Sequence, residues 1–470
     1  MYFERIYDDG LAQASYIVAC PGSGEAAVVD PLRDLDQYLD KIDELGFDLV
    51  GVVETHIHAD FLSGGRDLAR ATGATLYISG EQSEGWEYAG LDGLDVVEMT
   101  HGDQFKLGNV VIEAAHTPGH TPEHLSFLVT DGAQSDEPMM ALTGDFAFVG
   151  DLGRPDLLEK AAGERGTAET GAKQLFDSVK NVLCQWDDSV QIWPGHGAGS
   201  ACGKALGSIP ASTVGYERRN AWWGPYVEND DPEGFADELL SGQPESPTYF
   251  RNMKEMNRDG VEGQDAVVPS IPRLTPEGFR EAADFDVNLL DLRDFEDFSR
   301  EHIAGSVNLP SLDSLSDQAG WVVDYDRPIV LVVEPQNLDE ATRALYRVGF
   351  TDFEGYIPRI GGYATATDHI ELIDAGRAHV LKTHQDAMIL DVRSQSEFNE
   401  GHIPGAKHVH YGRLEDHLDE MPDDRPIVVH CASGRRAMVG ASILESNGFE
   451  NIYNFPGGVD EWRDDGFDVE

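Results

Sequence analysis

Thr55-His56-Ile57-His58-Ala59-Asp60-Phe61 directly follows Val50–Glu54 (VGVVE), a β-branched run that is typical of a buried strand. Three side chains that can bind a metal, those of His56, His58 and Asp60, therefore leave one strand end together. Sites in α/β proteins usually form at the C-terminal ends of strands. The stretch predicts such a site in an α/β domain.

Three more clusters of His and Asp follow predicted strands in the same way. They are His116–Thr121 (HTPGHT) after VVIEAA, Thr143–Asp145 (TGD) after MMAL, and Trp193–Gly197 (WPGHG) after SVQI. A single histidine in such a loop is more often a surface or core residue than a ligand. Four strand-end loops that each offer His or Asp are most simply explained by a metal site. Residues 1 to about 245 read as a mixed α/β block that contains it.

These residues resemble the metallo-β-lactamase fold superfamily, whose signature HxHxDH stands here as HIHADF, followed by PGHT, GDFAFVGDLGRPD and WPGHG. Within it, the chain looks most like the persulfide dioxygenases. The resemblance covers about residues 1–240 and implies an αββα fold with one Fe(II) per chain. It implies that the ligands are His56, His120 and Asp145, the two-imidazole and carboxylate set that suits non-haem iron.

The resemblance also gives roles to neighbouring residues. His58, Asp60 and His196 would orient the ligands or bind intermediates, although Asp60 could instead be structural. Phe61 stands where the signature has a last His that normally helps to hold a second metal. A phenyl ring cannot coordinate a metal, so a dinuclear zinc site is disfavoured.

Three residues are weaker candidates for contacts with substrate. Arg154 in GRPD could meet an anionic thiol or could fix its loop through an ion pair. Tyr216 and Arg218 belong to a locally basic stretch that could contact carboxylates or phosphates, or could be solvated surface.

The second half of the chain contains an internal repeat. Leu289–Ser306 (LLDLRDFEDFSREHIAGS) matches Ile389–Ala406 (ILDVRSQSEFNEGHIPGA) at a constant offset of 100 residues. A period of this length indicates two small α/β domains and not a solenoid. With a short helix and a linker expected within 228–270, the predicted domains are 1–265, 266–376 and 377–470.

Only the last copy carries a reactive loop, Cys431-Ala432-Ser433-Gly434-Arg435-Arg436, between the strand RPIVVH and a predicted helix. Backbone N–H groups, the helix N-terminus and the arginines favour a thiolate at Cys431. The loop resembles the active loop CxxGxR of the rhodanese family, which implies catalytic roles for Cys431, Gly434 and Arg436. The middle copy has VVEPQNLDEATRAL in the corresponding position and lacks the Cys, so we interpret it as an inactive rhodanese-like domain.

Composition limits the partners. Across 470 residues, 34 Lys+Arg face 86 Asp+Glu, a formal net charge of -52. Nucleic acid and anionic membranes are therefore disfavoured, and the evenly spread acid suits a halophile's cytoplasm. Four cysteines indicate a reducing compartment, and Cys20, Cys184 and Cys202 are interpreted as structural. No apolar run is long enough to form a membrane span or the core of a signal peptide.

Together, the resemblances imply a persulfide dioxygenase that converts a small-thiol persulfide and dioxygen into sulfite. Cys431 would transfer sulfane sulfur, with thiosulfate as the product where sulfite is the acceptor. Two alternatives stay open: a zinc thiolester hydrolase of the glyoxalase II kind, and a sulfur carrier without turnover. Dioxygenases of this fold often associate, so a homo-oligomer is an expectation, whereas the identity of the thiol is left open.

Overall fold

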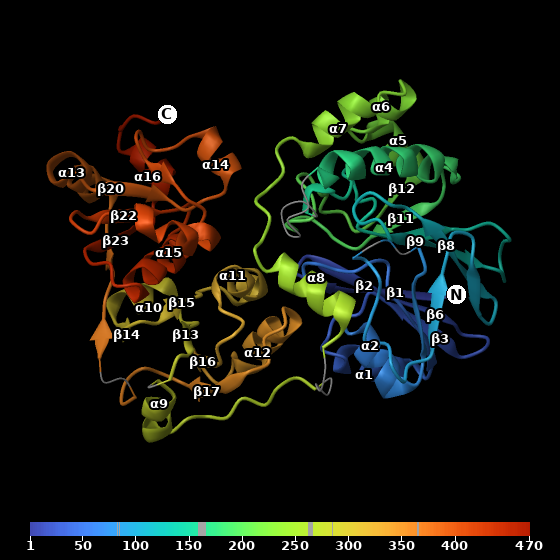
Figure 1. The fold of residues 1–470 in the computed structure, drawn as a ribbon, viewed down its shortest axis with the longest axis horizontal. Coiled ribbons are helices and arrows are strands. Elements are labelled where there is room, and N and C mark those ends of the chain that lie inside the picture. The colour runs from blue at the N-terminus through green and yellow to red at the C-terminus, as the bar shows by residue number, and fades with distance from the viewer. Residues whose placement is uncertain (82, 84, 158–165, 262–266, 284, 364–365) are drawn as a thin grey trace. The chain divides into compact units, whose positions relative to one another are not determined.

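A computed structural model describes residues 1–470 except 82, 84, 158–165, 262–266, 284 and 364–365. The chain divides into two compact units (Figure 1). The first unit is Met1–Val267 with Arg347–Gly349, and the second is Val268–Tyr346 with Phe350–Glu470. All four His/Asp clusters lie in the first unit, and both copies of the repeat lie in the second.

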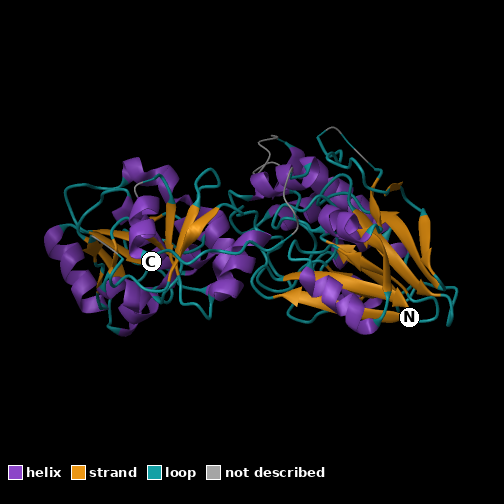
Figure 2. Ribbon diagram, turned by 90° about the horizontal axis from the view of Figure 1, so that it is seen from below, coloured by secondary structure: helices purple, strands orange, loops and turns teal. Residues whose placement is uncertain are grey.

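Two mixed sheets form the middle of the first unit, and helices cover their outer faces (Figure 2). The first sheet follows chain order: β1 (Tyr2–Asp8), β2 (Gln13–Cys20), β3 (Glu25–Val29), β4 (Asp48–Val53), β5 (Thr75–Ser79) and β6 (Val96–Met99). The second has the order β12 (Ser212–Thr213), β11 (Gln191–Pro194), β10 (Met140–Gly144), β9 (Leu125–Asp131), β8 (Val110–His116) and β7 (Gln104–Leu107). The predicted strands SYIVA, VGVVE and VVIEAA fall in β2, β4 and β8.

Both sheets bury apolar side chains, because apolar and polar residues alternate along some of their strands and other strands are apolar throughout. The faces that meet between the sheets share one core, which includes Tyr16, Val18, Val29, Val53, Ile112, Phe127 and Leu142. A second core fills the space between the second sheet and its helices, and includes Phe146, Leu175, Trp223 and Phe235. This αββα arrangement carries the loops after β4, β8, β10 and β11.

The described helices of the first unit are α1 (Asp36–Leu45), α2 (Gly65–Thr72), α4 (Thr167–Asn181), η1 (Leu183–Gln185), α5 (Val214–Asn220), α6 (Gly224–Glu228), α7 (Pro232–Leu240) and α8 (Phe250–Asp259). The sequence predicted one short helix and then a linker within 228–270, but α7 and α8 both lie there. Helix α8 buries Phe250, Met253, Lys254 and Asn257. That spacing of i, i+3, i+4 and i+7 is helical, and the two polar members hid it from a search for apolar residues.

The second unit contains two parallel sheets, one from each copy of the repeat. The copy that lacks the cysteine, called here the cysteine-less copy, has the order β15 (Val307–Asn308), β13 (Asn288–Asp291), β16 (Ile329–Val332) and β17 (Phe353–Ile357). The cysteine-bearing copy has the order β19 (Glu371–Leu372), β23 (Ile452–Phe455), β22 (Ile427–His430), β20 (Met388–Asp391) and β21 (Lys407–His408). A small separate pair joins β14 (His302–Ile303) and β18 (Thr367–Asp368).

The described helices of this unit cover the sheets. The cysteine-less copy has α9 (Pro276–Ala283), α10 (Phe295–Arg300), η2 (Leu312–Ser314), α11 (Leu315–Val322) and α12 (Leu338–Arg347). The cysteine-bearing copy has α13 (Ala375–Gln385), α14 (Gln395–Glu400), η3 (Tyr411–Glu420), α15 (Arg435–Ser446) and α16 (Gly458–Asp464).

Repeated residues make the same contacts in both copies. The guanidinium of Arg293 donates to Asp291, and that of Arg393 donates to Asp391. His302 Nδ1 bonds to the carbonyl of Phe298 and its ring stacks on Phe298 at 3.8 Å; the same contacts recur one hundred residues later in the second copy. The shared motif is therefore a scaffold, and the two copies differ in the loop that follows β16 or β22.

The two copies also pack against each other. Trp321 of α11 lies directly on Gly412, where a Cβ would come within 2.3 Å of the indole ring. The Tyr411 hydroxyl donates to Asp317 of α11 at 3.2 Å. Burial raises the pKa of the Asp317 carboxyl to about 6, although hydrogen bonds with Tyr411 and Trp321 act in the opposite direction.

Asp317→Asn is expected to stabilise the protein near neutral pH. Since the folded pKa lies above the ordinary value near 3.8, ionisation costs stability. That cost grows from pH 4 to about 6 and is fully present above pH 6. An amide oxygen can still accept from Tyr411 without carrying charge. We expect a gain of about 1–2 kcal/mol at pH 7.5 and none at pH 4 in urea unfolding.

Asp313→Asn, at an exposed site of the same copy, is the control and should change the free energy of unfolding little, because its side chain is solvated. An equal effect of Asp317→Asn at both pH values would contradict this origin of the penalty.

In the part of the chain that the structure describes, we find no helix of sufficient length and apolarity to cross a bilayer.

Candidate metal centre and cysteine loop

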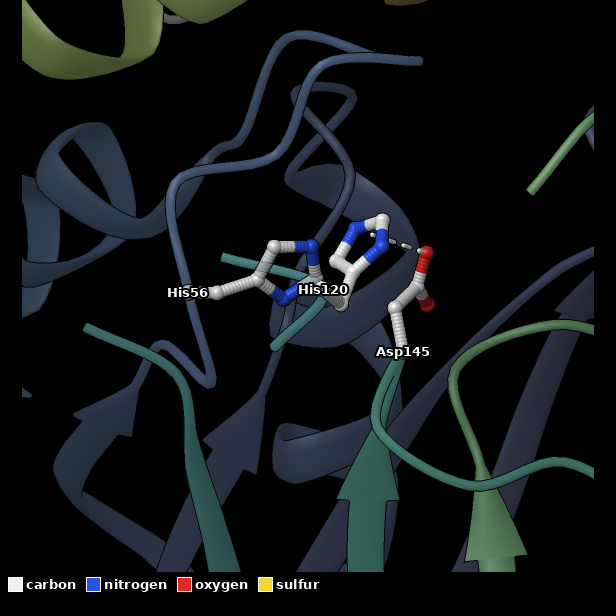
Figure 3. A group of neighbouring side chains, drawn as sticks. All are labelled: His56, His120 and Asp145. Atoms are coloured by element: carbon white, nitrogen blue, oxygen red, sulfur yellow. Dashed lines mark ion pairs between the residues drawn. The ribbon is translucent and has the colours of Figure 1, made fainter. Parts of the chain in front are cut away.

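The loops after β4, β8 and β10 bring three predicted ligands together. The ligand atoms of His56, His120 and Asp145 all lie within 4.8 Å of one another, and all three residues are buried (Figure 3). His120 Nε2 is 3.6 Å from Asp145 Oδ2. β3 pairs in parallel with β4, and β10 pairs in parallel with β11. The C-terminal ends of each pair, from which the His/Asp loops leave, therefore lie at the same edge of their sheet.

Both imidazoles have Nδ1 engaged, which leaves Nε2 for a metal. His120 Nδ1 lies 3.1 Å from the carbonyl of Arg154, which can only accept, so Nδ1 carries the proton. The Thr55 hydroxyl donates to Asp30, so its lone pair accepts from His56 Nδ1 at 2.9 Å. Burial lowers the pKa of both imidazoles, which favours the neutral form that binds metals.

Asp145 is held as a carboxylate by His196. Burial alone would raise the pKa of Asp145, but the charge and hydrogen bond of His196 outweigh burial and hold it well below the ordinary value. His196 Nδ1 donates to Asp145 Oδ1 at 2.7 Å, and Nε2 donates to Asp60 Oδ2 at 2.6 Å. Burial disfavours charge on His196, yet these two carboxylates raise its pKa to about 10.

The free atoms of this group fit one divalent metal. Among the described residues, the buried Oδ2 of Asp145 has no hydrogen-bond partner. Two neutral imidazoles and one carboxylate thus offer three donors to a common point, a set typical of non-haem iron. Gly195 keeps the space open, since a Cβ there would be 2.7 Å from Asp145 Oδ1.

His58 turns to a different set of carboxylates. Its Nε2 lies 3.2 Å from Asp30 Oδ1 and 3.4 Å from Glu54 Oε2, and all three side chains are buried. Burial would lower the pKa of His58, but Asp30 and Glu54 raise it well above the ordinary value. His58 therefore neutralises carboxylates beneath the loop, one of which, Asp30, orients His56 through Thr55.

Of the three predicted substrate contacts, Arg154 is fully buried. Its guanidinium binds Asp156 through two nitrogens, at 2.7 and 2.6 Å, and donates to the carbonyl of Ala201. This is the loop-fixing arrangement. Tyr216 is 57% exposed on α5, and Arg218 forms an ion pair with Asp188. The described contacts of these two residues are not with the His/Asp group.

Two further residues lie at the site and were not predicted to be there. His124 Nε2 accepts from the backbone N–H of Asp145 at 3.1 Å, and its ring stacks on His56. Its spacing of four residues from His120 was the available signal. Cys202, interpreted as structural, belongs to a buried group with Asp60 and His196 whose ligand atoms lie within 4.8 Å of one another. Burial and nearby carboxylates raise the pKa of its thiol well above the ordinary value.

The cysteine loop lies between β22 and α15. Cys431 Sγ accepts from the backbone N–H of Ala437 at 3.4 Å, so the first turn of the helix faces the sulfur. Gly434 is the N-cap residue and has φ +83°. Both guanidinium NH2 groups of Arg436 donate to Glu397 at 2.7 Å, which fixes this arginine beside the loop.

Comparisons with known proteins agree with both halves of the chain. The family model of the metallo-β-lactamase superfamily matches residues 8–183, and that of the rhodanese-like domain matches 275–357 and 365–465. A crystal structure of a metallo-β-lactamase from Staphylococcus aureus is 41% identical, with a TM-score of 0.69, over 76% of this chain and 99% of its own. The chain belongs to the metallo-β-lactamase superfamily. Its C-terminal half carries two rhodanese-like domains.

Members of the superfamily with different activities match this chain about equally. Hydroxyacylglutathione hydrolase GloC of Haemophilus influenzae is 29% identical over 39% of this chain and 86% of its own. The mitochondrial persulfide dioxygenase ETHE1 of Bos taurus is 28% identical over 41% of this chain and 66% of its own. Identity does not separate hydrolase from dioxygenase, so the choice depends on the site.

Proposed function

We propose that this superfamily member is an iron-dependent persulfide dioxygenase coupled to sulfur transfer at Cys431. The reaction is RSSH + O2 + H2O → RSH + SO3²⁻ + 2H⁺. The observation that carries the proposal is the buried group of His56, His120 and Asp145, whose ligand atoms lie within 4.8 Å of one another and include the unpaired Oδ2 of Asp145, a set that fits Fe(II). The persulfide dioxygenase among the relatives, and a cysteine loop in the same chain, support it.

When bound, Fe(II) would supply the one-electron chemistry that dioxygen requires. The residues around the proposed ligands hold each of them in one protonation state and one tautomer. His196, charged between Asp60 and Asp145, keeps Asp145 ionised and occupies its second oxygen. Thr55 and the carbonyl of Arg154 fix the tautomers of the two imidazoles. The buried rings of Phe61 and Phe148 pack against those of His58 and His196 and add apolar surface beside the site.

Sulfur transfer would then use the other half of the chain. The thiolate of Cys431 attacks the outer sulfur of a persulfide, RS⁻ leaves, and the outer sulfur stays on Cys431. The N–H of Ala437 and the N-terminus of α15 stabilise the resulting anion. The two halves share one class of substrate, a small-molecule persulfide.

The second candidate is a dinuclear zinc thiolester hydrolase, which Cys202 favours. Phe61 cannot bind a metal, but Asp60, His196 and Cys202 together form a carboxylate, imidazole and thiol group. Zinc accepts such ligands. Against it, both nitrogens of His196 are already hydrogen-bonded to carboxylates, which a second metal would have to displace.

Metal content and oxygen uptake separate the two. The full chain, purified without oxygen and loaded separately with Fe(II) or Zn(II) in concentrated salt, is given a panel of small-thiol persulfides and thiolesters. We expect one iron per chain, one dioxygen consumed per persulfide, and sulfite or thiosulfate as product. Two zinc per chain with thiolester hydrolysis and no oxygen uptake would instead establish the hydrolase. Iron in the site without uptake of oxygen would leave only a sulfur carrier.

A further inference from the structure

Helix α15, which follows the cysteine loop, is buried on all sides. Every residue from Ala437 to Leu444 is buried, a full two turns. A helix that covers one sheet normally leaves its outer face to solvent. The corresponding helix α12 is less completely covered: it buries Ala341, Thr342, Ala344, Leu345 and Tyr346, but Arg343 and Arg347, one turn apart, are only half-buried. Something in addition to the sheet of its own copy therefore covers α15.

The cysteine-less copy supplies that cover. The backbone N–H of Asn308 donates to Ser442 Oγ at 3.0 Å, in the middle of α15. His302 Nε2 lies 2.5 Å from Glu445 Oε2, at the C-terminal end of α15. At the N-terminal end, the ring of Phe295 from α10 reaches Gly434. The helix is thus held along its length by a copy that has no cysteine of its own.

The contact at Gly434 confines the cysteine loop. A Cβ at this position would lie 2.8 Å from Pro456 and 3.0 Å from the ring of Phe295. The loop is therefore enclosed between a proline of its own copy and a phenylalanine of the other. The positive φ of Gly434 and these two contacts leave no room for a larger residue there.

The sulfur lies deep in this loop. Cys431 is 1% exposed, whereas Ala432 and Ser433, which follow it, are exposed at the surface. A sulfur acceptor that reacts at Cys431 must therefore pass the side chains that surround the loop. Phe295 is half-buried, and its ring meets the loop at Gly434.

We propose that Phe295 of the cysteine-less copy determines acceptor size at Cys431, admitting a small anion such as sulfite and hindering larger thiols. This inference rests on the proposed sulfur transfer and gives the inactive copy a role in it. Phe295 acts as a specificity residue that narrows the approach to the persulfide.

The transfer step itself is balanced without a further reactant. The lone pair on the sulfur of sulfite attacks the outer sulfur of Cys431–S–S⁻. The S–S bond breaks, its electron pair returns to Cys431 as a thiolate, and thiosulfate leaves. A thiol acceptor would yield its own persulfide in the same way, but it must bring a carbon chain past Phe295.

The test uses the full chain, loaded with sulfur from thiosulfate, freed of small molecules and kept without oxygen. Sulfite or glutathione is then added, and thiosulfate or alkylated glutathione persulfide is quantified against time. We expect Phe295→Ala to raise the ratio of the glutathione to the sulfite rate constant by about tenfold or more. Phe295→Trp should lower that ratio, and Phe295→Leu should fall between the alanine variant and the native chain.

Phe285→Ala is the matched control, because Phe285 belongs to the same copy but is 72% exposed. It should leave the ratio unchanged. Oxygen uptake by the first unit should stay unchanged in every variant and reports that this unit is folded, whereas the rate constant with sulfite, which should change little, reports the same for the second unit. An unchanged ratio in both Phe295→Ala and Phe295→Leu would overturn the inference. Failure of the native chain to transfer sulfur to either acceptor would instead refute the sulfur-transfer half of the proposed function.

Discussion

Replacing His120 by alanine is expected to abolish oxygen consumption, with a loss of at least a hundredfold. The imidazole offers one of three donors whose free atoms converge, and its Nδ1 is already engaged by the carbonyl of Arg154. Without Nε2, only His56 and Asp145 are left to hold the metal, which cannot fix it in one geometry. Iron content, measured after dialysis against a weak chelator, should fall together with oxygen uptake.

His116→Ala is the matched control for this change. His116 lies in the same HTPGHT stretch, but its Nε2 binds the carbonyl of Pro122 and its side chain is 28% exposed. We expect it to retain iron and most of the oxygen uptake. Full iron content with full activity in the His120 variant would show that the ligand set is wrong.

Replacing Cys431 by serine is expected to reduce sulfur transfer to the background rate and to leave oxygen uptake within twofold. A serine hydroxyl stays protonated in the place where a thiolate must attack sulfur. The readout is the persulfide on the protein, detected by mass spectrometry after exposure to thiosulfate, together with thiosulfate formation from sulfite.

Cys184→Ser gives the comparison, since Cys184 is a half-buried cysteine of the first unit outside both sites. It should leave both activities unchanged. Persulfide found on another cysteine in the Cys431 variant, with transfer intact, would move the reactive sulfur elsewhere. Cys202 would then be the next candidate for the reactive sulfur, because it lies beside Asp60 and His196.

Much of the candidate site could be predicted from sequence because each proposed ligand occupies a short motif at a strand end. HIHADF follows VGVVE, HTPGHT follows VVIEAA, and TGD follows MMAL. Strand propensity and the register of the flanking residues are local properties, so these placements needed no tertiary information. The same holds for the offset of 100 residues and for the cysteine loop ahead of α15.

Other features had no local signal. Helix α8 was predicted as a linker because its buried face includes Lys254 and Asn257. Asn257 donates to the carbonyls of His58 and Phe61, contacts that span almost two hundred residues. A polar residue is predicted to be exposed unless the hydrogen-bond partner that allows its burial is known.

By itself, the sequence determined which residues could act and that the chain repeats, because ligand spacing, strand ends and a period of 100 residues are written along one dimension. Only the tertiary structure decided how they combine. It showed His58 bound to Asp30 and Glu54, Cys202 beside Asp60 and His196, and Phe295 against Gly434. These contacts depend on which strand ends and which helices pack together. Burial then influences the charge of the side chains involved and limits what can approach them. No spacing along the chain contains that information.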